Sequence, residues 1–115
     1  PQLIVVGSVS QTETISSFSN RPGFACLSET SSCAPGQRLM DRFLVAPGEL
    51  ILVSDDKFGV KRHTATSVAA PLVAGAVALM HDRWPWLARH PQETADILLR
   101  SAKDLGAAGV DPVYG

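Results

Sequence analysis

A serine at the start of a long apolar run is the first residue in this sequence that could do chemistry. The seventeen residues 64–80 carry no charge, and Ser67 lies near their beginning. In the first turn of a helix, backbone N–H groups lack helical partners and the helix dipole favours negative charge. The N–H of Ser67 could therefore hold the oxyanion of a tetrahedral intermediate formed at its own hydroxyl. Ala65 and Ala69 are small enough for a substrate to approach. The competing interpretation is structural, because most serines at helix starts only cap the helix.

The two cysteines, Cys26 and Cys33, have six residues between them and are the only ones in the chain. A zinc site would need two more ligands, and no histidine lies close in sequence. The spacing favours a small disulfide ring, which would remove about 2–3 kcal/mol of unfolded-chain entropy. Two unpaired thiols are the alternative. A disulfide implies an oxidising compartment, so that the protein would be secreted, periplasmic or at the cell surface.

The charge-free run predicts the helix that would position Ser67. Its composition of Ala, Val, Leu and Gly75 is typical of a helix buried nearly all round. Pro71 is tolerable only in the first turn, so we expect the helix to begin near residues 67–68 and to end near residues 80–83. A membrane span would need about 20 apolar residues. Three hydroxyl residues at the start of the run and Pro71 disfavour that interpretation.

A second helix is expected from Pro91 to a stop at Gly106, with one apolar face formed by Ala95, Leu98, Ala102 and Leu105. Short apolar runs predict three strands, at residues 3–6, 43–45 and 50–53. Gly7 and Ser8 are expected to loosen the end of the first strand. Ile15 and Phe18 are expected to attach a Ser/Thr-rich stretch to the core, and residues 21–41 to form a long surface excursion.

Composition excludes several classes of protein. The 115 residues fit one domain, with 45% apolar and 18% charged residues. Ten basic against eleven acidic side chains give a net charge of −1, which argues against a nucleic-acid binder or a polybasic membrane-surface protein. The chain starts at Pro1 without a signal-peptide pattern, and is expected to be either a processed piece or an artificially cut piece of a longer protein.

The run around the serine carries a family resemblance. Residues 65–75, ATSVAAPLVAG, resemble the nucleophile motif G-T-S-x-A-x-P-x-V-x-G of the subtilisin-like serine peptidases, and ten of the eleven positions agree or are free. Four other segments resemble the family in the same order, with the last two closest to bacterial secreted and autotransporter-type members: residues 3–9 with 18–20, residues 45–48 (VAPG), residues 98–106 and residues 109–115 (GVDPVYG).

The resemblance implies an α/β fold class. The expected architecture is part of a three-layer fold, with a mostly parallel sheet, flanking helices and a buried helix that starts at the nucleophile. Residues 1–115 would be the C-terminal portion of the peptidase domain. In a Ser-His-Asp triad, Ser67 would be the nucleophile, its backbone N–H one oxyanion donor and Thr66 a supporting neighbour. His63 would fall on the leaving-group side, although we favour its interpretation as an ordinary loop histidine. No metal site and no cofactor are implied.

Two departures from the family pattern matter. Ala65 replaces the motif glycine, which would cost energy if that position needed a positive φ or a close backbone approach. The family's aspartate, histidine and oxyanion asparagine belong to segments that precede the matched region. His81 and His90 match no catalytic position of the family. His81 is expected to place a favourable positive charge near the negative, C-terminal end of the helix dipole.

The expected partners are therefore the missing N-terminal half of the domain and a peptide or protein substrate. Nucleic acid and a transmembrane segment are not expected. Because serine without a base is a weak nucleophile, we expect this chain alone to be inactive. An open sheet edge and an uncovered apolar helix should also make it prone to association.

Three functions are compatible with this pattern. The first is a serine endopeptidase in which this chain supplies only the nucleophile, Ser67. The alternative is a non-catalytic subtilase-like binding or scaffold module in which Ser67 caps a helix, and Ala65 is the feature that favours it. A different serine hydrolase with an elbow-like turn fits less well, because Pro71 and the apolar helix after it match the subtilisin pattern better.

Overall fold

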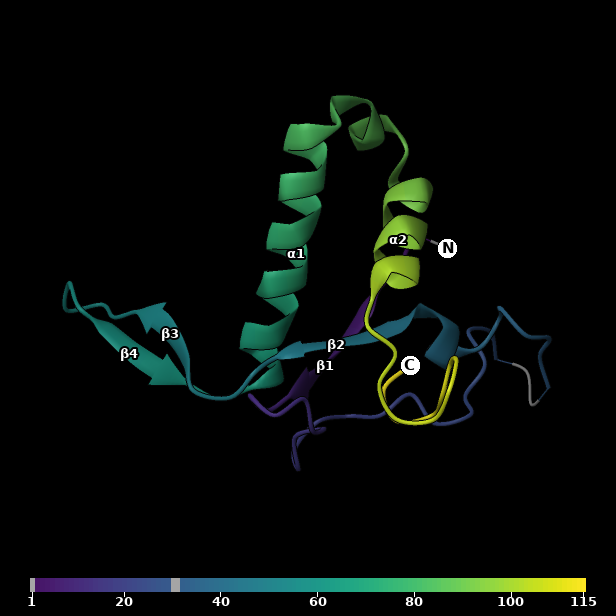
Figure 1. The fold of residues 1–115 in the computed structure, drawn as a ribbon, viewed down its shortest axis with the longest axis horizontal. Helices are drawn as coiled ribbons and strands as arrows, with labels where there is room; N and C mark the ends of the chain where they lie inside the picture. Colours follow the sequence, from purple (N-terminus) through teal and green to yellow (C-terminus); the bar gives the residue numbers. More distant parts are fainter. Residues whose placement is uncertain (1, 30–31) are drawn as a thin grey trace.

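A computed structural model describes residues 2–29 and 32–115, so that Pro1 and the middle of the expected disulfide ring, residues 30–31, lie outside the described part. The described elements give an α/β fold (Figure 1). They are β1 (Val5–Val9), η1 (Leu39–Arg42), β2 (Phe43–Pro47), β3 (Ile51–Ser54), β4 (Val60–His63), α1 (Thr66–Arg83), η2 (Pro85–Arg89) and α2 (Pro91–Ser101), where η denotes a 3-10 helix.

Strands β1 and β2 pair in parallel, with Val5 opposite Phe43 and Val9 opposite Pro47. The expectation that Gly7 and Ser8 loosen the end of the first strand is wrong, because both residues lie inside β1. Gly7 leaves room for the ring of Phe43, since a Cβ on Gly7 would lie 2.6 Å from the ring carbon Cζ. The parallel register brings the carboxyl ends of both strands to the same edge.

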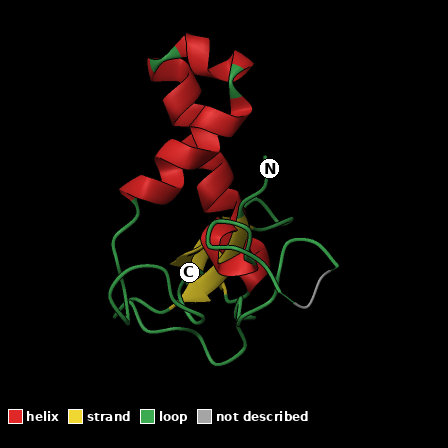
Figure 2. Cartoon of the chain, turned by 90° about the vertical axis from the view of Figure 1, so that its right-hand side faces the viewer, coloured by secondary structure: helices red, strands yellow, loops and turns green. Residues whose placement is uncertain are grey.

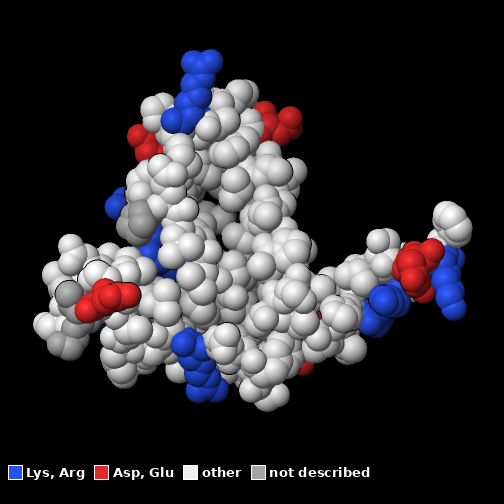
Figure 3. All heavy atoms as spheres, turned by 180° about the vertical axis from the view of Figure 1, so that it is seen from behind, with Lys and Arg blue, Asp and Glu red and all other residues white. Residues whose placement is uncertain are grey.

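Strands β3 and β4 form a separate antiparallel hairpin, with Ile51 opposite His63 and Ser54 opposite Val60. Residues 60–63 were not among the three expected strands, and their pairing with β3 makes them a strand although all four are exposed. The hairpin projects sideways from the body of the chain (Figure 1). Lysine, arginine and acidic side chains gather near its end, whereas the surface between the helices is largely uncharged (Figure 3).

Helix α1 begins at Thr66, one residue before the predicted start, and ends at Arg83, within the predicted range. Its burial differs from the prediction. Ala69 is its one fully buried residue within the described chain, and Leu79 has 73% of its surface exposed. Both α-helices rise from the same side of the β1–β2 pair (Figures 1 and 2). Much of the apolar surface of α1 is therefore exposed in the described structure. Neither described helix has the length and hydropathy that a membrane crossing requires.

Helix α2 begins at Pro91 as expected but ends at Ser101 rather than near Gly106. Ala102 has an extended backbone, with φ of −65° and ψ of 143°, which stops the helix one turn early. Ala102 and Leu105 therefore do not belong to its apolar face. An ion pair of 2.8 Å between the buried Arg42 and Asp96 fastens α2 to the start of β2. The hydrogen bond from Arg42 lowers the pKa of Asp96.

His81 links the two helices near their far end. Its Nε2 atom lies 3.1 Å from Oγ1 of Thr94. The Thr94 hydroxyl donates its proton to backbone carbonyls, with the oxygen of His90 at 3.1 Å and that of Leu87 at 3.2 Å. Thr94 is buried, so that these bonds satisfy a polar group that water does not reach. The side chain of His81 therefore has a packing role between α1 and α2.

The Ser/Thr-rich stretch is attached to the core differently from the prediction. Ile15 is half-buried and bridges to Val9, as expected of an anchor. Phe18 is 45% exposed, so its expected role as an anchor is wrong, and the neighbouring Ser16 is buried instead. Farther along, Cys26 and Cys33 form a disulfide with their Cα atoms 5.9 Å apart.

Candidate active site

The turn before α1 is fastened to the carboxyl ends of both parallel strands. The N–H of Gly48, which follows β2, donates to the oxygen of Val9 at the end of β1, at 3.2 Å. The oxygen of Gly48 then accepts from the N–H of Ala65 at 2.9 Å. Ser67 lies two residues farther on, so that its position is set from the strand ends. In α/β proteins, this edge of a parallel sheet is where ligands bind.

Ser67 lies in the first turn of α1 and is exposed. Ala65 occupies the N-cap position and provides no side-chain cap. Among residues 2–29 and 32–115, the structure has no hydrogen bond to the Ser67 hydroxyl. This geometry does not match a capping role for Ser67. The hydroxyl is free to meet a ligand, and its own N–H lies in the turn where the helix supplies no acceptor.

Ala65 is compatible with its backbone conformation. Its φ of −173° and ψ of 158° are extended, a conformation that any residue adopts. The sequence had raised the concern that a glycine with positive φ was needed here, and the structure has no such requirement. The residue that needs to be glycine lies across the hydrogen bond, at Gly48. A Cβ there would collide with Oγ of Ser8 and would lie 2.9 Å from the oxygen of Ala65.

Pro71 does not lie in the first turn, contrary to the prediction, because α1 begins at Thr66 and makes Pro71 its sixth residue. Proline lacks the N–H that would bond to the carbonyl four residues earlier. In α1 that carbonyl belongs to Ser67. The backbone oxygen of Ser67 is thus left without the N–H donor that an ordinary residue at position 71 would supply.

The other residues considered from the sequence, Thr66 and the histidines, provide no catalytic partner for Ser67 in the described structure. Thr66 is the first residue of α1 and is half-buried. His63 ends β4 opposite Ile51 and is exposed, so it is a strand residue rather than the loop histidine that we expected. The described structure has no hydrogen bond between His63 and Ser67. His81 and His90 lie toward the far ends of the helices, and neither accompanies Ser67.

A buried polar cluster beneath the site was missed by the sequence analysis. The hydroxyl of Ser16 donates to Oε2 of Glu49 at 2.6 Å, and the hydroxyls of Ser16 and Ser8 are 2.8 Å apart. Ser8 is fully buried and Ser16 almost so. The one signal in the sequence was the VAPG step at residues 45–48, which ends immediately before Glu49.

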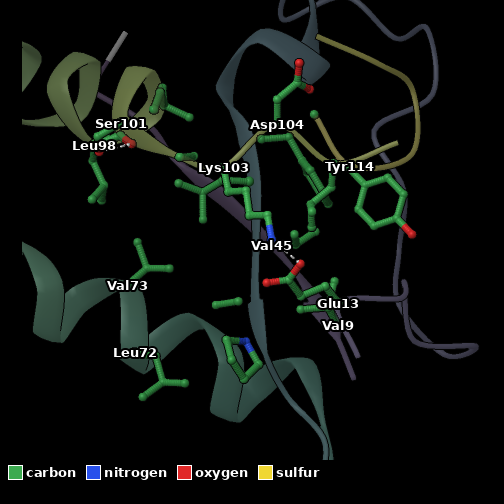
Figure 4. A pocket seen from close by; sticks show the side chains of 18 of the residues that line it. Val9, Glu13, Val45, Leu72, Val73, Leu98, Ser101, Lys103, Asp104 and Tyr114 are labelled. Atoms are coloured by element: carbon green, nitrogen blue, oxygen red, sulfur yellow. Dashed lines mark hydrogen bonds and ion pairs between the residues drawn. The ribbon is translucent and has the colours of Figure 1, made fainter. Parts of the chain in front are cut away.

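A large cleft lies elsewhere in the described structure. It has a volume of about 760 Å³ and lies between the β1–β2 pair, the two helices and the C-terminal loop. Leu72 and Val73 enter it from α1, and an ion pair of 2.7 Å between Lys103 and Glu13 lies at its side (Figure 4). Ser67 does not line it, so the cleft reflects the open apolar side of α1 rather than the candidate site. Among the described residues, no three histidine, cysteine or acidic side chains are grouped as metal ligands.

Two curated relatives share sequence with the chain. Serotype-specific antigen 1 of Mannheimia haemolytica is 31% identical over 98% of this chain, which spans 11% of that protein. The Neisserial autotransporter lipoprotein NalP of Neisseria meningitidis serogroup B is 42% identical over 44% of this chain and 4% of its own length. The chain thus spans only a small part of the curated relatives it matches.

Solved protease structures share the fold. The Clostridium perfringens CspB protease matches with a TM-score of 0.74 and 30% identity over 97% of this chain and 24% of its own. The self-cleaved protease domain of PatA matches with a TM-score of 0.66 and 28% identity over 90% of this chain and 34% of its own. The model of the subtilase family matches residues 1–115. Together with the serine at the start of α1, these matches identify the chain as a member of the subtilase family of serine peptidases.

Proposed function

We propose that this chain is the serine-bearing C-terminal portion of a subtilisin-like endopeptidase domain, with Ser67 as the nucleophile. The observation that carries the proposal is the exposed, unbonded Ser67 hydroxyl in the first turn of α1, two residues after a backbone fastened to the carboxyl ends of β1 and β2. Membership of the subtilase family supports the reaction class.

In the proposed reaction, Oγ of Ser67 attacks the scissile carbonyl carbon of a peptide. A histidine from the rest of the domain takes the hydroxyl proton and then delivers it to the leaving amine, and an aspartate orients that histidine. The backbone N–H of Ser67 and an asparagine side chain from outside this chain hold the oxyanion. Water then attacks the acyl-enzyme ester with the same histidine as the base, which releases the acyl group and regenerates the Ser67 hydroxyl. Thr66 supports the turn as the first residue of α1.

The remaining part of the domain has a second role in this proposal, which is to cover α1. Leu79 and Leu72 have 73% and 45% of their surfaces exposed, and much of the rest of the helix surface is alanine and glycine. Burying a leucine side chain contributes roughly 1.5–3 kcal/mol. We therefore propose that the N-terminal half docks on this surface and brings its histidine and aspartate to Ser67.

A fluorophosphonate probe tests the nucleophile in the full-length protein. We expect covalent labelling that is lost in Ser67→Ala, because only an activated serine reacts with the probe. Ser101→Ala is a matched control, since Ser101 is an exposed serine at the end of α2. Absence of labelling in a folded, full-length protein would refute the proposal and favour a binding or scaffold module.

The 115-residue chain alone provides a second test. Without a base it should not be labelled, and the exposed surface of α1 should make it associate in solution. Size-exclusion chromatography and thermal unfolding measure this behaviour. A monomeric, cooperatively melting and unlabelled chain would contradict the proposed docking surface while leaving Ser67 untouched. A labelled chain would contradict the claim that the base lies outside it.

We also propose that the protein works outside the cytoplasm, as a secreted, periplasmic or surface protein. The disulfide between Cys26 and Cys33 supports an oxidising compartment. One relative is named an autotransporter lipoprotein, which agrees with that location.

A further inference from the structure

The hydrogen bonds among Ser8, Ser16 and Glu49, beneath the turn before α1, are all donated in one direction, toward Glu49. A serine hydroxyl has one proton, and Ser16 uses its proton to donate to Oε2 of Glu49 at 2.6 Å. The bond of 2.8 Å between Ser8 and Ser16 must then be donated by Ser8. Each hydroxyl is thus oriented by the next, and the carboxylate of Glu49 is the acceptor at the end of the chain.

Burial makes this orientation consequential. Ser8 and Ser16 have 0% and 2% of their surfaces exposed, so that water cannot replace a lost partner. A buried hydroxyl without a partner costs roughly 1–3 kcal/mol. The orientation of the two hydroxyls therefore depends on Glu49 as the acceptor, and a connected network of this kind fixes one arrangement of the segments it joins.

The chain of bonds borders the backbone that leads to the nucleophile. Oγ of Ser8 lies against Gly48, close enough to exclude a Cβ there. The oxygen of Gly48 accepts from the N–H of Ala65 at 2.9 Å. On the other side of Glu49, the N–H of Leu50 donates to Oγ1 of Thr64 at 2.9 Å. Glu49 thus lies between two hydrogen bonds that hold residues 64–65, immediately before α1.

We propose that Glu49 is a positioning residue for Ser67, acting through Ser16 and Ser8 on the turn at Gly48 and from there on Ala65. The inference rests on the proposed function, because it concerns the placement of the nucleophile and of its N–H. Glu49 touches neither substrate nor reacting atoms in this role. Its carboxylate fixes the position of the turn that precedes α1.

The test is the kinetics of fluorophosphonate labelling in the full-length protein, which needs no knowledge of the substrate. Glu49→Ala should lower the limiting rate constant of labelling about tenfold and leave the probe concentration at half-saturation unchanged, since small misplacements of a nucleophile slow chemistry before binding. Glu49→Gln keeps a carbonyl oxygen to accept from Ser16, and should recover the rate to within about threefold of the unaltered protein. Glu13→Ala, which removes an exposed carboxylate paired with Lys103, is the matched control.

Two further measurements separate positioning from general loss of structure. Ser16→Ala should slow labelling as Glu49→Ala does, and the double variant should be no slower than the slower single variant, because both changes break one chain. Hydrogen exchange at the amide of Ala65 should accelerate in both single variants at temperatures where the protein stays folded.

The outcomes are distinct. Unchanged labelling in Glu49→Ala, or multiplying effects of Glu49→Ala and Ser16→Ala, would overturn the inference and leave Ser67 as the nucleophile. No labelling of the unaltered folded protein would overturn the proposed function and this inference with it. A slowed Glu49→Ala, a recovered Glu49→Gln and faster exchange at Ala65 together support the positioning role.

Discussion

Gly48→Ala is the substitution whose effect follows most directly from the geometry. Gly48 lies between the side chain of Ser8 and the backbone of Ala65, and its own N–H and oxygen both form hydrogen bonds across the site. An added Cβ would collide with Oγ of Ser8 and would lie 2.9 Å from the oxygen of Ala65. Ser8 and Ala65 both form hydrogen bonds, so neither can move away from the added Cβ without losing one of them.

The magnitude follows from what must move. If Ser8 rotates away, its hydroxyl and that of Ser16 lose their bond of 2.8 Å in a site without water, at a cost of roughly 1–3 kcal/mol. If Ala65 moves instead, the bond of 2.9 Å to Gly48 lengthens and the overpacked turn costs about 1–3 kcal/mol. Alanine restricts the unfolded chain and returns roughly 0.4–1 kcal/mol. We expect a net destabilisation of about 1.3 kcal/mol, which is the difference between the centres of these two ranges.

Denaturant unfolding of the full-length protein measures this loss. Gly59→Ala is the control, because a Cβ on Gly59 in the β3–β4 turn meets nothing within 4 Å. The double variant Ser8→Ala with Gly48→Ala should be less destabilised than the sum of the two single changes, since removing Oγ of Ser8 relieves the worst contact. If Gly48→Ala and Gly59→Ala have equal effects on the free energy of unfolding, the packing argument fails.

Three further predictions concern other parts of the chain. Ala65→Gly should leave the labelling rate of the full-length protein within about threefold, because the extended backbone there already suits alanine; a large gain in rate would contradict this. Replacing Cys26 and Cys33 by serine should cost about 2–3 kcal/mol in denaturant unfolding, and both thiols should resist labelling until reductant is added. Because Arg42 lowers the pKa of Asp96 in the folded state, that ion pair should stabilise the protein fully above about pH 4 and less as the pH falls further. Asp96→Asn should abolish this part of the acid sensitivity, and an unchanged pH profile of unfolding would contradict the assignment.

The sequence was sufficient to predict the elements that are marked by contiguous residues. The charge-free run predicted α1, and Pro91 marked the start of α2. The end of α2 was misjudged, because the apolar spacing continues to Leu105 whereas the backbone turns extended at Ala102. Strand β4 was missed because residues 60–63 carry no alternating pattern, and only their pairing with β3 makes them a strand.

The candidate site was predictable only in part, for a related reason. Ser67 could be singled out from its neighbours in sequence, since the serine, the helix start and the small residues are contiguous. The bonds among Ser8, Ser16 and Glu49 join segments that are 8 and 33 residues apart, and neither periodicity nor spacing indicates such a contact. A buried serine is indistinguishable in the sequence from the exposed serines around it until the fold brings an acceptor to it.

The largest disagreement between pattern and structure lies on α1, and it has a physical explanation. A helix that is apolar on every side is expected where neighbours surround it, because water gives no stability to such a surface. In the described structure Leu79 is largely exposed and an open cleft of about 760 Å³ adjoins Leu72 and Val73. The composition of the helix therefore fits the enclosed environment of the proposed complete domain better than that of this chain. If the same helix surface were protected from hydrogen exchange and probe binding in the isolated chain, its apolar character would need another cause.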